Sequence, residues 1–180
     1  MADISAESVG QPKAVLLEGY IWDCPEGPAL ARKAIDIARA EGAAIALSLS
    51  DSFCVARHRD SFEDFVRNGV DIVLADEDEI NQLLGTSTFD DTLAAIRDYS
   101  NLFALTRSEK GSVIIQGDLQ VSQAATPVDK VVDSTGAGDA YSAGFLFGWA
   151  NDYPLDECAR LGTYCATTVI QQLGARIEPG

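Results

Sequence analysis

Short apolar runs alternate with helical patterns along most of the chain, and this alternation limits the fold more than any other feature. It predicts buried strands at 14–20, 43–49, 70–75 and 101–106. Helices are predicted between these strands, among them a helix over 29–41 that ends at Gly42 and a short amphipathic helix that carries Phe62 and Phe65. Strands that alternate with helices in this way form βαβ units, so the sequence predicts an α/β fold with a mainly parallel sheet.

The alternation of predicted strands and helices ends after residue 106. Two short apolar runs within 112–122 flank Gly117 and Asp118, which predicts an antiparallel hairpin at one edge of the sheet. An apolar run over 140–150 and a helical pattern over 155–173 predict two further helices. Residues 1–13 are polar and predict a weakly structured lead-in, so we expect one domain over 14–180.

A glycine-rich loop precedes the predicted helix over 140–150. The segment 133–139 reads DSTGAGD and is expected to follow the end of a strand. Gly136 and Gly138 have no Cβ, so the backbone can turn sharply and an anion can approach its N–H groups. The positive end of a helix dipole at the same place favours a bound phosphate. Asp139 puts a carboxylate beside that phosphate, where it suits the transfer of a proton better than the binding of an anion.

Two more polar groups follow predicted strands. Four consecutive acids at 76–79 come after the third strand, and the segment 106–111, TRSEKG, comes after the fourth. Ligands of open parallel sheets bind beyond the carboxyl ends of the strands, so these groups and the glycine loop are expected at one edge. The acids would suit Mg²⁺, which prefers one or two carboxylates together with water and phosphate oxygens. The alternative for the acids is a capping role in the first turn of a helix.

The segment 133–139 resembles the D-T-x-G-A-G-D signature of the PfkB, or ribokinase-like, carbohydrate kinases. The resemblance implies that Asp139 is the catalytic base that deprotonates a substrate hydroxyl. It implies that the backbone N–H groups of Gly136, Ala137 and Gly138 form the anion hole for the transferred phosphoryl group. Asp133 and Thr135 are similar to positions that help to hold a monovalent cation such as K⁺ in some members, and Asp133 is therefore counted among the metal positions.

The other two groups also resemble family motifs. Asp76 and Glu79 are similar to the N-x-x-E motif that organises Mg²⁺ and phosphate, with Asp76 in place of the asparagine. The segment 106–111 is similar to the T-x-G-x-x-G loop near the ATP phosphates. In it Thr106 and Gly111 match, Ser108 replaces the first glycine, and Arg107 either adds charge toward a phosphate or is a solvated surface residue. The resemblance thus implies ATP and Mg²⁺ as cofactors.

The resemblance extends from Val15 to Ala175 and implies a three-layer αβα fold of the ribokinase-like type. The chain is similar to the C-terminal half of such a kinase, so the N-terminal part of the fold and the lid are expected to be absent. The implied activity is transfer of the γ-phosphoryl group of ATP to a hydroxyl of a sugar or nucleoside, with little activity expected of this chain alone. The alternative is a non-catalytic half-domain that binds nucleotide or forms a homodimer.

Composition and isolated residues exclude several other classes. The formal net charge of −15 argues against nucleic acid or an anionic membrane as a partner, and without a leader or a long apolar run we expect a cytoplasmic protein. The four cysteines have no zinc-finger spacing and are predicted to be buried free thiols, and His58 is predicted in a surface or loop position. A purely structural turn would not need Asp139, and a Rossmann glycine motif would lie after an early strand.

Overall fold

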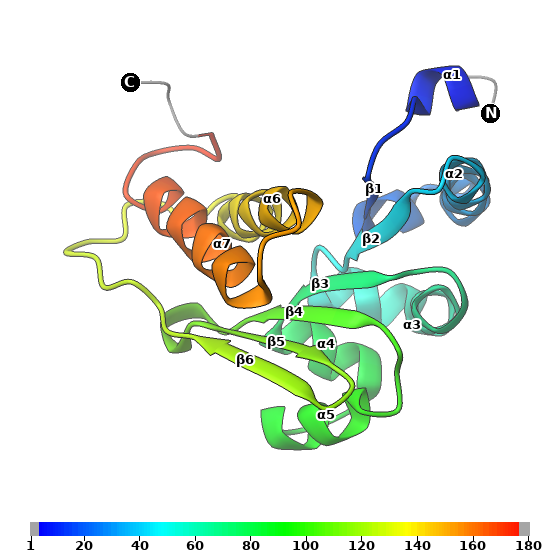
Figure 1. Cartoon of the computed structure of the whole chain (residues 1–180). Helices are drawn as coiled ribbons and strands as arrows, with labels where there is room; N and C mark the ends of the chain where they lie inside the picture. Colours follow the sequence, from blue (N-terminus) through cyan, green and yellow to red (C-terminus); the bar gives the residue numbers. More distant parts are fainter. Residues whose placement is uncertain (1–3, 177–180) are drawn as a thin grey trace. The chain divides into compact units, whose positions relative to one another are not determined.

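The computed structural model describes residues 4–176 (Figure 1). The chain divides into two compact units. Unit 1 comprises 1–103 with 116–118, and unit 2 comprises 104–115 with 119–180. The strands form one sheet in the order β1-β2-β3-β4-β5-β6. The sheet is mainly parallel with an antiparallel hairpin at its end, which confirms the predicted α/β class.

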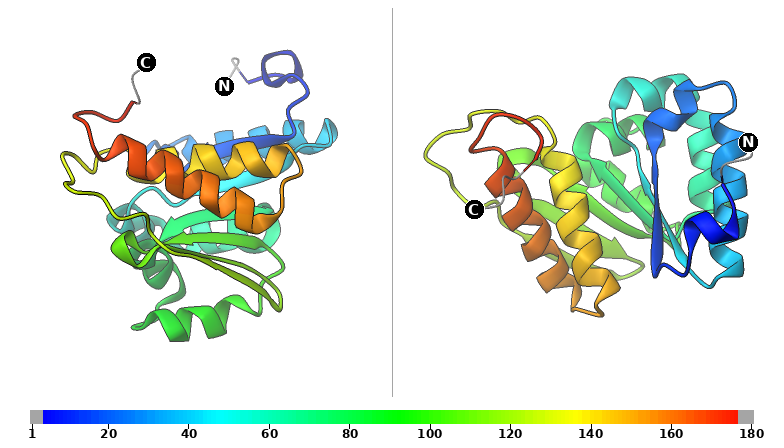
Figure 2. Two further views of the ribbon diagram at one scale, coloured as in Figure 1. Left: turned by 60° about the vertical axis from the view of Figure 1, so that its left-hand side comes forward. Right: turned by 90° about the horizontal axis from the view of Figure 1, so that it is seen from above.

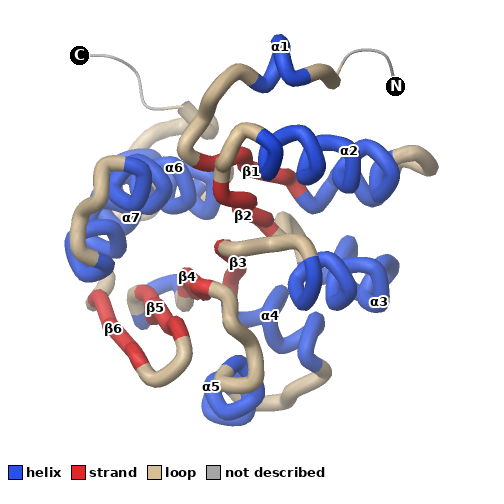
Figure 3. Tube along the Cα trace, turned by 45° about the vertical axis from the view of Figure 1, so that its right-hand side comes forward, coloured by secondary structure: helices blue, strands red, loops and turns tan. Residues whose placement is uncertain are grey.

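Unit 1 is built on three parallel strands, β1 (Ala14–Glu18), β2 (Ala44–Ser48) and β3 (Ile72–Asp76). Val15 of β1 lies opposite Ile45 of β2, and Leu47 of β2 lies opposite Val73 of β3. The centres of β2 and β3 are fully buried, as expected for strands covered on both faces. Two helices make the crossovers, α2 (Gly27–Ala40) and α3 (Ser52–Asn68), and both lie beside these strands in Figure 3.

The crossover helix α3 is much longer than the sequence pattern indicated. The side chain of Asp51 accepts a hydrogen bond from the N–H of Phe53 and so begins the helix at Ser52. Its first half is polar, which hid the helical period, and its buried residues include Cys54, Val55 and Phe62. His58 was predicted in a surface or loop position; it lies within a helix and not in a loop, and its side chain is partly exposed.

The remaining elements of unit 1 are short. They are α1 (Ala6–Val9) within the lead-in, the 3₁₀ helix η1 (Gly19–Asp23), α4 (Glu77–Leu84), α5 (Phe89–Ile96) and the first residues of β4 (Leu102–Thr106). Trp22 of η1 is buried against Phe62, with ring centroids 4.7 Å apart, and against Phe65 at 4.9 Å. These rings anchor η1 on α3.

Unit 2 contains the end of β4, the 3₁₀ helix η2 (Ser108–Lys110), the strands β5 (Ser112–Gln116) and β6 (Leu119–Gln123), and two helices. Connections as short as those between β4, β5 and β6 allow only antiparallel pairing, and Gly117 has the positive φ of 58° that suits a tight hairpin turn. The predicted hairpin is thus confirmed.

Helices α6 (Ala137–Ala150) and α7 (Leu155–Val169) lie side by side in both views of Figure 2. Glycines let them approach closely. A Cβ added to Gly144 of α6 would lie 2.6 Å from the carbonyl oxygen of Leu161, and one added to Gly162 of α7 would lie 2.9 Å from Tyr141. Phe145, Cys158 and Ala159 are fully buried, so this contact forms an apolar core.

Three predictions for unit 2 were wrong. Residues 124–134 form no helix or strand, and Val131 and Val132 are exposed, so the glycine loop does not follow a strand end. Helix α6 begins at Ala137, earlier than the expected 140, because Gly136 serves as its N-terminal cap. Helix α7 ends at Val169, short of the expected 173. Within residues 4–176 no helix combines the length and apolar character that crossing a bilayer requires.

Candidate active site

Asp133 holds the glycine loop in shape. Its carboxylate accepts hydrogen bonds from the N–H of Thr135 at 2.9 Å and from the N–H of Gly174 at 3.0 Å. Hydrogen bonds from Thr135, and then the one from Gly174, lower the pKa of Asp133 below its usual value, because they favour the charged form. Asp133 is therefore an ionised carboxylate that ties the loop to the chain after α7.

The loop turns at Gly136, which has a φ of 76°. A Cβ there would lie 2.6 Å from the Cβ of Ala175, so this position needs glycine for both conformation and space. The N–H of Ala137 donates to the carbonyl of Ser134 at 3.1 Å. The N–H groups of Gly138 and Asp139 find no acceptor among residues 4–176, as is usual in the first turn of a helix.

The open face of this first turn is at Gly138 and Asp139. A Cβ added to Gly138 would meet no atom within 4 Å, and the Asp139 side chain is exposed in the same turn. Two free N–H donors, the positive end of a helix and an accessible carboxylate thus lie together. This donor set fits a phosphate oxygen and leaves Asp139 free to accept a proton.

The segment 106–111 lies close in structure to the start of α6. The buried hydroxyl of Tyr141 donates to the hydroxyl of Ser112 at 2.8 Å, which joins the second turn of α6 to the residue after Gly111. Burial raises the pKa of Tyr141 to about 12, so this phenol stays protonated. Within unit 2 this hydrogen bond therefore holds the end of the segment 106–111 near the helix that the glycine loop begins.

The segment itself is a tight loop. Its ends are joined by a hydrogen bond of 2.8 Å from the N–H of Arg107 to the carbonyl of Gly111, and Ser108 has a φ of 51°. A positive φ favours glycine, so the serine that replaces the first glycine of the motif keeps the left-handed backbone at some conformational cost. Gly111, with a φ of 87°, packs against the backbone carbonyl of Gln123, where a Cβ would clash.

In unit 1, Asp76 and Glu79 cap helix α4 reciprocally. The N–H of Glu79 donates to Asp76 at 2.8 Å, and the N–H of Asp76 donates to Glu79 at 2.9 Å. Asparagine and aspartate serve equally well as N-terminal caps, which explains why Asp76 can stand in the asparagine position. The capping role expected as the alternative for these acids is therefore present.

Glu79 also lies in an unusual electrostatic environment. It is buried, and burial raises its pKa to about 7, assisted by the negative charges of Asp76, Asp51 and Glu18. A carboxyl group held among like charges in this way favours a bound cation, which would neutralise them. The donor set of carboxylate oxygens fits Mg²⁺.

The sequence analysis missed two members of this group, Glu18 and Asp51. Glu18 ends β1 and accepts a hydrogen bond from the Ser50 hydroxyl, whereas Asp51 follows β2 and lies 3.4 Å from the Tyr20 hydroxyl. Both lie at the carboxyl end of a strand. The rule that identified Asp76 and Glu79 would have found them if it had been applied to the first two strands.

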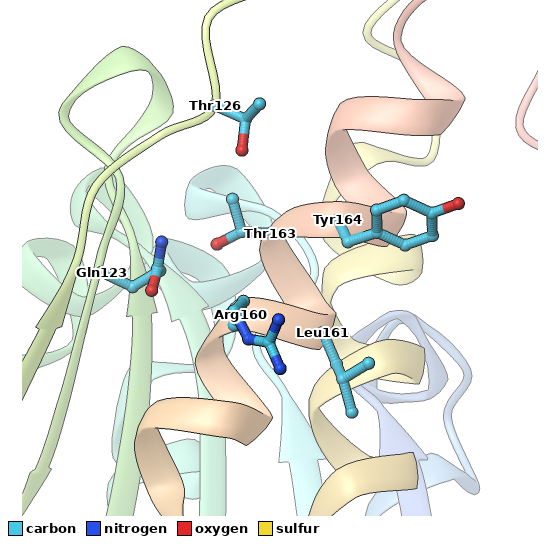
Figure 4. A pocket seen from close by; sticks show the side chains of 6 residues that line it. All are labelled: Gln123, Thr126, Arg160, Leu161, Thr163 and Tyr164. Carbon is cyan, nitrogen blue, oxygen red and sulfur yellow. The ribbon is translucent and has the colours of Figure 1, made fainter.

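A pocket of about 330 Å³ in unit 2 was also missed (Figure 4). It is lined by residues of β6, the segment that follows it and α7, namely Gln123, Thr126, Arg160, Leu161, Thr163 and Tyr164. The side chains of Gln123 and Thr163 offer polar groups there, and the ring of Tyr164 is largely exposed. No motif marks such a pocket, because its residues come from separate elements.

The chain is similar to several kinases of sugars and nucleosides. It is 44% identical to the solved structure of an adenosine kinase from Sinorhizobium meliloti, with a TM-score of 0.94 over 97% of this chain and 54% of that one. A ribokinase from Arabidopsis thaliana, solved with ribose and ATP, is 26% identical, with a TM-score of 0.75 over 97% of this chain and 55% of that one. A cytidine kinase from Thermococcus kodakarensis is 33% identical over 121 residues, which are 66% of this chain and 43% of the relative.

The chain thus spans about half the length of these relatives. Because the similarity to the adenosine kinase covers 97% of this chain, it extends over both units. The family model for the pfkB family carbohydrate kinases matches residues 1–179, and the chain belongs to that family.

Proposed function

We propose that this chain carries the phosphoryl-transfer centre of an ATP-dependent kinase whose acceptor is a hydroxyl of a sugar or nucleoside. The observation that carries the proposal is the first turn of α6. There the free N–H groups of Gly138 and Asp139, an open face at Gly138 and an exposed carboxylate occur together. Phosphoryl transfer requires little more than positioning, charge stabilisation and a base.

In this proposal Asp139 is the base. Its carboxylate accepts the proton of the attacking hydroxyl, while the N–H groups beside it donate to oxygens of the transferred phosphoryl group, which ATP supplies. Gly138 provides the clearance that lets those oxygens reach the backbone. Gly136 sets the turn, and Ala137, whose N–H is engaged by Ser134, has a smaller part in the anion hole.

We assign cation binding to two carboxylate groups. Asp76 and Glu79 are proposed to order hydrated Mg²⁺, with Glu18 and Asp51 adding negative charge. Asp133 and Thr135 are proposed to hold a monovalent cation such as K⁺. Because the Asp133 carboxylate already accepts two N–H groups, we expect this second site to be weak.

The nucleotide is proposed to bind unit 2. Thr106, Arg107, Ser108 and Gly111 would lie near the ATP phosphates, with Arg107 supplying charge. The pocket of Figure 4 would take the adenine, since Gln123 and Thr163 offer hydrogen-bonding groups, whereas the Tyr164 ring points away from them. The resemblance to the ribokinase-like kinases implies that the region of the last helix borders the adenine.

We assign the acceptor only as a class of molecule, a sugar or a nucleoside. The similarity to an adenosine kinase and to a cytidine kinase favours a nucleoside, whereas the similarity to a ribokinase favours a sugar. The alternative function is a nucleotide-binding or dimerising half-domain without kinase activity of its own. Cytoplasmic location, homodimerisation and the division into a 1–13 lead-in and a 14–180 domain remain predictions.

Calorimetry with Mg·ATP tests the binding part of the proposal. We expect the chain to bind Mg·ATP, and Gly138→Ala to weaken binding by about tenfold, because a Cβ would intrude on the open face. Ala143→Ser, at an exposed position later in α6, should leave affinity unchanged. A folded chain that binds no nucleotide would refute the proposed site.

Turnover tests the assignment of Asp139. The chain, and the full kinase if a longer protein exists, would be assayed for ADP release with a panel of sugars and nucleosides. Asp139→Asn should lower turnover by about 10²–10⁴-fold while ATP affinity is nearly kept. The matched control is Asp156→Asn, an exposed acid in the first turn of α7, which should have no effect. Chains that bind ATP but phosphorylate none of the panel would favour the half-domain alternative.

A further inference from the structure

Three side chains of unit 1 that the kinase chemistry does not use come together around one point. They are the carboxylate of Asp23, the thiol of Cys54 and the imidazole of His58, and one ligand atom from each lies within 4.8 Å of the other two. Cys54 and His58 are four residues apart on the same face of α3, and Asp23 is the last residue of η1. The sequence separates Asp23 from the other two, so spacing alone could not reveal the group.

The backbone of α3 is irregular at one of these residues. His58 has φ −123° and ψ 21°, which interrupts the helix between Ser52 and Asn68. That stretch contains neither glycine nor proline, the usual local causes of a kink. The imidazole Nε2 lies 2.9 Å from Asp23 Oδ1, so the irregularity coincides with the contact that brings His58 to Asp23.

Arg57 completes the surroundings. Its Nε donates to Asp23 Oδ1 at 3.1 Å and its terminal nitrogen donates to Oδ2 at 2.7 Å. If Oδ1 were taken by a cation, Oδ2 could keep its hydrogen bond to Arg57. A carboxylate that binds a metal through one oxygen and a hydrogen-bond donor through the other is a common arrangement around protein metal sites.

We propose that Asp23, Cys54 and His58 form a binding site for Zn²⁺ or a similarly thiophilic divalent cation. Thiolate, imidazole and carboxylate are the ligands that zinc takes in proteins, and three of them leave a fourth position for water. Tetrahedral coordination places ligand atoms about 3.5 Å from one another. His58 Nε2 and Asp23 Oδ1 must therefore separate slightly from 2.9 Å, and a pair near the 4.8 Å limit must close by about 1 Å. Asp23 is exposed and His58 partly exposed, whereas Cys54 is fully buried with its thiol donating to the Gly19 carbonyl at 3.5 Å. Binding of a cation therefore requires the Cys54 sulfur to leave this contact and face the other two ligands.

Binding of the cation requires one proton to leave. Burial raises the pKa of the Cys54 thiol, so this thiol is protonated at neutral pH. The metal–sulfur bond forms as the S–H bond breaks, and the proton passes to buffer. Because Asp23 lies on η1 and the other ligands on α3, the bound cation would fasten these two elements together.

Titration of the reduced chain with Co²⁺ tests the site, since cobalt substitutes for zinc and gives a thiolate charge-transfer band in the near ultraviolet. Carboxylate sites such as Asp76 and Glu79 give no such band. We expect one equivalent of Co²⁺ to produce the band, and Zn²⁺ to abolish it by displacement. Cys54→Ser should remove it, and His58→Gln should weaken Co²⁺ binding at least tenfold. Because His58 is partly exposed, we expect His58→Gln to fold. This variant therefore still tests the site if Cys54→Ser fails to fold.

The matched controls are the other thiols. Cys24→Ser alters an exposed cysteine beside Asp23, and Cys158→Ser alters a buried cysteine of unit 2. Both variants should keep the band. The proposal is overturned if the folded wild-type chain gives no band, if the band survives Cys54→Ser, or if Cys24→Ser removes it.

Discussion

At the scale of a single residue, Glu79 should make stability depend on pH. Its pKa is about 7 in the folded chain and 4.5 in a freely solvated group. Between these values the folded state keeps a proton that the unfolded state has released, so the free energy of unfolding falls as pH rises through this range. The reference is Glu79→Gln, which keeps an oxygen to accept the Asp76 N–H. Relative to this variant, the free energy of unfolding of the wild type should fall by about 3 kcal/mol between about pH 4.5 and pH 8.

Urea unfolding of both proteins at several pH values measures this difference. Asp78→Asn is the control, because Asp78 is an exposed acid in the same helical turn, and it should follow the wild-type pH dependence. If the free energy of unfolding changes with pH in the same way in the wild type and in Glu79→Gln, the pKa of Glu79 is not raised in the folded chain.

The same residue tests the assignment of Mg²⁺. At pH 8 the ionised Glu79 lies near Asp76, Asp51 and Glu18, so a bound dication should relieve the repulsion. Millimolar MgCl₂ should therefore raise the thermal midpoint of the wild type more than that of Glu79→Gln. CaCl₂ and NaCl serve as reference salts. If MgCl₂ raises the thermal midpoint of both proteins equally, Glu79 is not a ligand of the metal site.

At the scale of the element, the close contact of α6 with α7 depends on glycine. A Cβ at Gly144 would lie 2.6 Å from the Leu161 carbonyl oxygen and 2.8 Å from its carbon, both of them backbone atoms that cannot yield locally. Gly144→Ala should therefore destabilise the chain by about 1–3 kcal/mol, despite the better helix propensity of alanine. Thermal or urea unfolding gives the measurement.

Gly138→Ala is the comparison within the same helix. Its Cβ meets nothing within 4 Å, so stability should stay constant or rise by about 1 kcal/mol, while nucleotide affinity falls. A destabilising effect at Gly138 equal to that at Gly144 would contradict the packing argument.

The elements show which parts of the fold a sequence can reveal. The strands around Ile45, Val73 and Phe103 were predictable because continuous apolar runs mark buried strands. The first half of α3 was missed because its exposed residues are polar and its buried residues are few. The start of α6 was placed too late because an apolar run does not show that Gly136, with its positive φ, already caps the helix.

At the scale of the whole molecule, the sequence also reveals some residues of the candidate site and not others. Asp139, Gly136 and Glu79 could be proposed from the sequence because each lies in a short contiguous motif. The partners Glu18 and Asp51, the pocket around Thr163 and the group around Cys54 bring together residues far apart in sequence. The strand-end rule could have marked Glu18 and Asp51 as candidates, but only the fold shows that they lie near Glu79 and which residues meet around Thr163 and Cys54.

The charge of the whole chain leads to a final prediction. The 28 acidic residues outnumber the 13 basic ones, which gives a net charge of −15. Repulsion within the compact state exceeds that in the expanded chain, and about 0.1 M salt screens charges more than about 10 Å apart. The ion pairs between described side chains, such as Arg32 with Asp64, are largely exposed and lose little when screened. The free energy of unfolding by urea at pH 8 should therefore rise when NaCl is increased from about 0.02 to 0.2 M.

A pH control separates charge screening from other effects of salt. Near pH 5, closer to the isoelectric point of about 4.2, the net charge is smaller and the gain from NaCl should shrink. Sucrose, which carries no charge, should stabilise the chain equally at both pH values. If NaCl instead lowers stability at pH 8, the local ion pairs outweigh the net charge, and the acidic surface must be organised into stabilising networks that the overall charge of −15 conceals.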